Sequence, residues 1–132
     1  MPNGREPGVV AAAGFFALAG LLHLALSLWE MPRPLAFWPV WEAVGRTLFH
    51  LLLAVGLWRR LALCRTIALV YCLAALVTYA GALALAYARE PVQFPPTVVV
   101  ESLFEVPSCV LLFPYLRSAA AGRVFTRALF GG

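Results

Sequence analysis

The stretch from residue 66 to 88, TIALVYCLAALVTYAGALALAYA, decides the fold. It contains no charged residue. At a rise of ~1.5 Å per residue, a helix of this length crosses the ~30 Å hydrocarbon core of a bilayer. Backbone polar groups in lipid must be satisfied within their own segment, so this stretch predicts a transmembrane helix.

Three further apolar stretches of similar length surround it, and short segments rich in Pro or Arg separate them. Pro32 and Pro34 interrupt the first connection, Arg59 and Arg60 form the second, and prolines recur in the third. Proline cannot continue a helix, so these are breaks. We expect one domain over residues 1–132, an all-α integral membrane four-helix bundle, with spans at about 9–29, 38–58, 66–88 and 97–116.

The composition excludes other classes of protein. Apolar residues make up 63% of the 132 residues and charged residues only 12%, about half the charge of a typical soluble domain. The net charge of +4 comes from arginines near helix ends, so it does not indicate nucleic-acid binding. Cys64, Cys72 and Cys109 match neither a disulfide framework nor a zinc site. We expect no metal and no cofactor.

The arginines also predict the orientation. With four spans, both termini and the middle turn share one side, and that side carries most of the arginines. Positive charge marks the cytoplasmic side, so both termini are expected there. The first span is longer than the apolar region of a signal peptide, which favours an uncleaved helix. The tail at 118–130 carries Arg123 and Arg127 on one face and predicts a short amphipathic helix at the membrane interface.

Charged residues inside spans are costly and indicate a functional site. Glu42, Arg46 and His50 follow one another at single-turn spacing in the second span, as do Glu101 and Glu105 in the fourth. Nearly all the polar residues fall in the non-cytoplasmic half, where a carboxyl group can donate a proton or hold a cation. The candidate ligand-binding residues are Glu30, Glu42, Arg46, His50, Glu101, Glu105, His23 and Tyr79.

Simpler interpretations stay open for part of this set. Glu42 and Arg46 could form an ion pair along one helix, and Glu101 could extend to the interface. Glu105 lies deeper, and Pro107 after it predicts a kink that could open a cavity. His23 and His50 differ in depth by about one to two turns, which disfavours a shared haem.

The order of these features resembles the EXPERA domain, the four-helix membrane fold of the emopamil-binding protein and the sigma-2 receptor. The resemblance rests on Arg65–Tyr71 (RTIALVY) with Thr78 beyond it, on Ser102–Pro107 (SLFEVP), and on the order of the acidic residues. It implies a lipid-accessible pocket for a sterol-like or cationic amphiphilic ligand, with Glu30 and Glu42 at the family's acidic positions. Ala74 stands where family members carry a polar His, which argues against sterol isomerase activity.

Three functions follow from these patterns. The first is a membrane protein whose acidic intramembrane pocket binds a lipid-like, sterol-like or cationic amphiphilic ligand. The second is an accessory or scaffold subunit, whose polar residues pair with a partner's helices or with another copy of the chain. The third is an isomerase that transfers protons between carboxyl and histidine groups. A cavity reaching Glu105 and Glu42 would favour the first and third, and His50 near a carboxylate would favour the third.

Overall fold

The computed structural model describes residues 6–30, 37–88 and 96–129. Its helices are α1 (Pro7–Glu30), α2 (Phe37–Trp58), α3 (Ala62–Ala88), α4 (Pro96–Arg117) and α5 (Ala119–Val124). The all-helical fold class is confirmed, because within the described ranges the only non-helical pairing is one isolated bridge between Leu61 and Arg127. Helices α1 to α4 are each long and apolar enough to cross a membrane, which is consistent with a multi-pass membrane protein.

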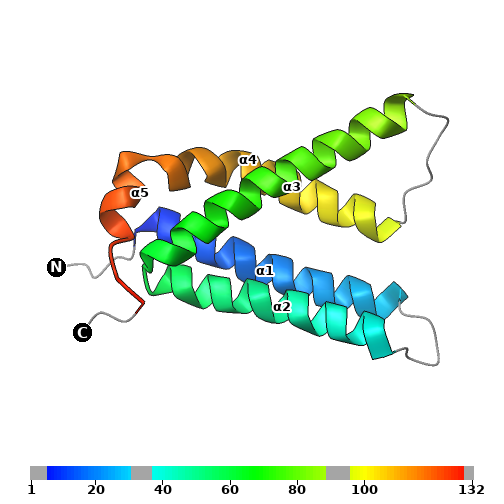
Figure 1. Ribbon diagram of the computed structural model, residues 1–132, viewed down its shortest axis with the longest axis horizontal. Coiled ribbons are helices and arrows are strands. Elements are labelled where there is room, and N and C mark those ends of the chain that lie inside the picture. The colour runs from blue at the N-terminus through cyan, green and yellow to red at the C-terminus, as the bar shows by residue number, and fades with distance from the viewer. Residues whose placement is uncertain (1–5, 31–36, 89–95, 130–132) are drawn as a thin grey trace.

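The four long helices form two antiparallel pairs. Helices α1 and α2 pack along their length, α4 packs on both α1 and α3, and the C-terminal half of α3 diverges from α2 (Figure 1). The start of α1, the α2–α3 turn and α5 lie at the same end of the molecule (Figure 1). We call this the α5 end. The opposite end carries the end of α1 and the start of α2.

The apolar core is concentrated toward the α5 end. Its largest fully buried apolar side chains include Phe16, Leu57, Leu116 and Phe125. The buried residues of α1 all lie between Val9 and Gly20, and none lies in the ten residues that follow, up to Glu30. Packing therefore fixes the helices most firmly at one end and leaves the other end for polar side chains.

The outer faces of α3 and α4 are poorly covered. Only 17% of the residues in their apolar windows are buried, against 39% in α1 and α2. Leu103 and Leu111 of α4 and Val70 and Val77 of α3 are among the exposed large apolar side chains. Such surfaces suit contact with lipid or with other membrane helices.

A tight turn joins α2 to α3, as Arg59 and Arg60 predict. The Leu61 N–H donates to the Gly56 carbonyl at 3.0 Å, and the Arg60 N–H donates to the Leu57 carbonyl at 2.9 Å. This pair of bonds is a Schellman motif, which requires a left-handed residue at the position of Arg60. Arg60 indeed has a φ of 62°, a conformation that glycine adopts more easily.

The tail corrects the amphipathic helix expected over residues 118–130. Helix α5 covers only Ala119–Val124, and Phe125 is buried in the core, whereas a position at the membrane interface stays a prediction. Beyond it the chain is extended, because the Arg127 carbonyl accepts from the Ala62 N–H at 3.0 Å and the Arg127 N–H donates to the Arg60 carbonyl at 3.2 Å. The tail is docked on the α2–α3 turn by these backbone bonds, which single-face patterning does not encode.

Arg65 holds the junction of α4 and α5. Its Nε donates to the Leu116 carbonyl at 2.7 Å and its Nη2 to the Ser118 carbonyl at 3.4 Å. Carbonyls at the end of a helix lack partners within it, so the bond from Nε satisfies the Leu116 carbonyl. The Ser118 carbonyl also accepts from the Gly122 N–H at 3.1 Å. Ser118 also caps α5, because its Oγ accepts from the Ala121 N–H at 3.1 Å.

Candidate functional site

Glu105 is the centre of a polar network among the four long helices. It lies on α4 and its side chain is buried, with an exposed fraction of 4%. The Tyr71 hydroxyl donates to its Oε1 at 3.1 Å and the Tyr79 hydroxyl to its Oε2 at 3.2 Å. Both tyrosines lie on α3, about two turns apart, so a single helix face supplies a donor to each carboxylate oxygen.

His50 extends this network to α2. Its exposed fraction is 1%. The Arg46 backbone carbonyl accepts a hydrogen bond from His50 Nδ1 at 2.7 Å, and His50 Nε2 lies 3.0 Å from the Tyr71 hydroxyl. The rings of Phe16, Phe49 and Tyr71 surround it. His50 therefore faces the interior of the bundle with both ring nitrogens engaged.

The hydrogen-bonded series His50–Tyr71–Glu105 has one hydrogen fewer than its contacts require. The single Tyr71 hydroxyl hydrogen faces two acceptors, the neutral His50 Nε2 and the Glu105 carboxylate. Every contact is satisfied only when one further proton is present. That proton can lie on His50, with Tyr71 donating to Glu105, or on Glu105, with Tyr71 donating to His50. The two arrangements differ by the movement of hydrogens along the chain, which is the geometry of a proton relay.

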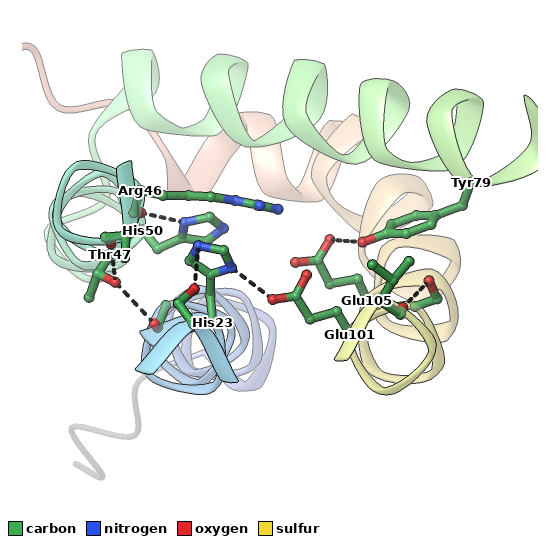
Figure 2. A network of polar contacts seen from close by, with 12 residues as sticks. His23, Arg46, Thr47, His50, Tyr79, Glu101 and Glu105 are labelled. Carbon is green, nitrogen blue, oxygen red and sulfur yellow. Dashed lines mark hydrogen bonds and ion pairs between the residues drawn. The ribbon is translucent and has the colours of Figure 1, made fainter. Parts of the chain in front are cut away.

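A second contact joins α1 to α4. His23 Nδ1 lies 2.7 Å from Glu101 Oε1, and the two side chains are 12% and 14% exposed. Ser27 Oγ lies 3.3 Å from His23 Nε2, which engages the other ring nitrogen. Figure 2 shows His23 and Glu101 reaching toward each other from the two helices. Glu101 is therefore held inside the bundle rather than extended to the interface.

The side chain of Arg46 lies beside this network without joining it. This partly buried side chain extends from α2 alongside His50 toward the carboxylates of α4 (Figure 2). Within the described ranges, its guanidinium makes no hydrogen bond or ion pair, including with Glu42 one turn away. The ion pair that the spacing of Glu42 and Arg46 suggested is absent among the described residues, because the Arg46 side chain is directed across the bundle.

The structure brings most of the predicted site residues together. Those that meet in the space among the four long helices are His23, Arg46, His50, Tyr79, Glu101 and Glu105 (Figure 2). Glu42 and Glu30 do not join them, because both are exposed, on α2 and at the end of α1. Their part in ligand binding stays a prediction.

Two residues of the network escaped the sequence analysis as site residues. Tyr71 lies outside the non-cytoplasmic half to which the sequence analysis assigned the polar residues, yet it connects His50 to Glu105. Its spacing of eight residues from Tyr79 was the available signal, since residues two helical turns apart share a face. Thr47 is buried and donates to the Ala43 carbonyl at 2.7 Å. It gave no signal, because the same bond forms in any helix.

An apolar pocket of about 330 Å³ opens between α3 and α4. Tyr79 is part of its wall, and the Tyr79 hydroxyl is bonded to Glu105. The pocket therefore ends one side chain away from a buried carboxylate. The other residues that line it are Ala82, Val98, Val99, Ser102, Leu103, Val106 and Pro107.

No group of three or more His, Cys, Asp or Glu side chains able to hold a metal ion is found in the part of the chain that the structure describes.

Comparisons of the chain with protein-family models, with curated proteins and with solved structures find no match.

Proposed function

We propose that this chain is a multi-pass membrane protein with both termini in the cytoplasm, and that it binds an amphiphile within the bilayer. The apolar body of the ligand occupies the pocket between α3 and α4, and its cationic or hydrogen-bond-donating end reaches Glu105. One observation carries the proposal: Tyr79 lines the apolar pocket and also holds the Glu105 carboxylate.

The polar end of the ligand supplies the selectivity. Lipid tails are as apolar as the pocket wall, so moving an alkyl chain from the bilayer into the pocket contributes little free energy. A cation that reaches a carboxylate in low dielectric contributes much more. Because the pocket is apolar except near Tyr79 and Ser102, a ligand with one charged end has a single favoured orientation. The resemblance to the EXPERA domain supports the same class of ligand.

The test uses the full chain purified in mild detergent, with a thermal-shift readout. A long-chain alkylamine is compared with the uncharged alcohol of the same chain length. We expect the amine to stabilise the protein and the alcohol to do so far less, because binding only the folded state raises its stability. In Glu105→Gln the stabilisation by the amine should disappear, whereas Glu6→Gln, a change to an exposed carboxylate next to the start of α1, should retain it.

Equal stabilisation by amine and alcohol, or equal loss in both variants, would refute a role for Glu105. Native mass spectrometry of the same sample then distinguishes ligand binding from the alternative function as an accessory subunit. Bound lipid supports the pocket, whereas a partner chain retained with the purified protein supports the subunit.

The proton relay favours an isomerase-type reaction as a second candidate function. His50 is linked to Glu105 through the Tyr71 hydroxyl rather than by direct contact. Such a reaction needs a substrate proton within reach of either end of this chain. Exchange of deuterium from solvent into a bound sterol-like ligand, lost in Tyr71→Phe and retained in Tyr79→Phe, would support this candidate over simple binding.

A further inference from the structure

We infer that the ligand of this site carries both charges: an anionic phosphate group bound by Arg46 and an ammonium group bound by Glu105 and Glu101. This inference rests on the proposed function and specifies the chemistry of the ligand's polar end. It follows from the charges that the fold holds apart across the bundle.

Arg46 contributes the positive side. A guanidinium has five N–H donors and cannot lose its charge in a protein. In the described residues none of these donors is used, although the side chain is partly buried and lies beside His50 (Figure 2). An unpaired charge within a span is expensive, so this position favours a partner that comes from outside the chain.

Glu101 and Glu105 contribute the negative side, on α4. Each carboxylate can accept about four hydrogen bonds. Glu105 receives two of these bonds from tyrosines, and Glu101 is contacted through Oε1 by His23. Within the described ranges the Glu101 Oε2 atom has no partner. Both groups therefore keep acceptor capacity for a further donor.

The two sides do not neutralise each other by direct contact. A ligand with only a positive charge would satisfy the carboxylates but would also face the Arg46 guanidinium. A ligand with only a negative charge would satisfy Arg46 but would face two carboxylates. A zwitterion satisfies both sides, and a phosphate suits Arg46 because its oxygens match the planar fork of a guanidinium. Going from the pocket between α3 and α4, Tyr79 and Glu105 come first and Arg46 follows (Figure 2). A phosphorylated long-chain amino alcohol has its charges in this order, because its ammonium lies between the alkyl chain and the terminal phosphate.

The experiment measures the affinity of the purified protein for three probes with alkyl chains of equal length: a 2-amino alcohol phosphorylated at its terminal hydroxyl, an alkylamine and an alkyl phosphate. Inorganic phosphate is a fourth arm. We expect the zwitterion to bind about tenfold more tightly than the amine, because its phosphate adds hydrogen bonds between charged groups at Arg46. The alkyl phosphate should bind weakest of the three chains.

Arg46→Gln should remove the preference for the zwitterion and leave binding of the amine unchanged or stronger. Arg46→Lys keeps the charge without the fork and should give an intermediate preference, which guards against loss of folding in the first variant. Arg123→Gln, a change to an exposed arginine on α5, is the matched control and should change nothing.

The outcomes separate this inference from the function on which it rests. If the amine binds in a Glu105-dependent way and Arg46→Gln keeps the tenfold preference, the zwitterion is refuted and the amphiphile site survives. If none of the three alkyl probes binds, both the zwitterionic ligand and the amphiphile site are refuted. Stabilisation by inorganic phosphate alone, lost in Arg46→Gln, would support phosphate recognition and identify free phosphate rather than a lipid head group as its source.

Discussion

The close approach of α1 and α2 at Gly20 gives the sharpest prediction for the fold. A Cβ atom at Gly20 would lie 2.8 Å from His50 Cβ and 3.4 Å from the Thr47 carbonyl oxygen. Two carbon atoms need ~3.5–4.0 Å, so Gly20→Ala forces the helices apart by about 1 Å. The same movement lengthens the 3.5 Å hydrogen bond from Thr47 Oγ1 to the Gly20 carbonyl.

Gly14 provides a matched reference on the same helix, because a Cβ atom there meets nothing within 4 Å. Gly14→Ala should gain ~0.5–1 kcal/mol from helix propensity alone. Gly20→Ala has the same gain but adds an overpacking cost of ~1–3 kcal/mol. The difference between the two variants therefore isolates the clash, at ~1–3 kcal/mol.

The assay is thermal unfolding of the two variants in the same detergent. At roughly 4 °C per kcal/mol for a chain of this size, Gly20→Ala should melt about 4–12 °C below Gly14→Ala. Equal melting temperatures, or a higher one for Gly20→Ala, would refute the contact between Gly20 and His50. Because that contact positions His50, the Gly20 variant should also weaken binding of the alkylamine, whereas the Gly14 variant should not.

Three other substitutions test separate parts of the structure, each by thermal unfolding in detergent. Tyr71→Phe should lower the free energy of unfolding by ~1–3 kcal/mol, because both His50 and Glu105 lose a hydrogen-bond partner. Tyr79→Phe should lower it by less, since only Glu105 loses a partner. A larger loss in Tyr79→Phe than in Tyr71→Phe would contradict the proton relay. Arg65→Gln should cost ~1–3 kcal/mol because it leaves the Leu116 carbonyl at the α4–α5 junction without its partner, and faster proteolysis of the tail would locate the effect. Arg60→Gly should stabilise the α2–α3 turn by ~1 kcal/mol, since glycine adopts the left-handed conformation freely; a loss of stability there would show that the Arg60 side chain matters more than its backbone.

Hydropathy predicted the four long helices well because the constraint behind it is simple. A backbone in lipid must satisfy its own polar groups, so an apolar stretch of sufficient length has one available structure. The extent of the tail helix was wrong for the complementary reason. Arg123 and Arg127 have helical spacing, yet the chain leaves the helix after Val124, and backbone bonds between Arg127 and the α2–α3 turn hold it. Contacts between distant segments are not encoded in local periodicity.

For the candidate site, the depth of the residues along the helices could be predicted from the sequence, whereas the direction of their side chains could not. Depth along a helix can be counted from the sequence, and this count placed His23, His50, Glu101 and Glu105 in one region. The direction of a side chain cannot be counted so simply. Glu42 and Arg46 have the spacing of an ion pair, but Glu42 is exposed and Arg46 points into the bundle. Packing of α1 against α2 sets the rotation of α2, and that rotation separates the two residues.

The unequal packing of the two ends explains how the chain can keep Arg46 apart from the carboxylates. In a loose bundle, a guanidinium would move until it met a carboxylate, because a buried unpaired charge is costly. Here the core near Phe16 and Leu57 fixes the rotation of α1 and α2, and two tyrosines and His23 hold the carboxylates on α4. A ligand that bridges Arg46 and the carboxylates should therefore couple α2 to α4, which make no direct polar contact with each other among the described residues.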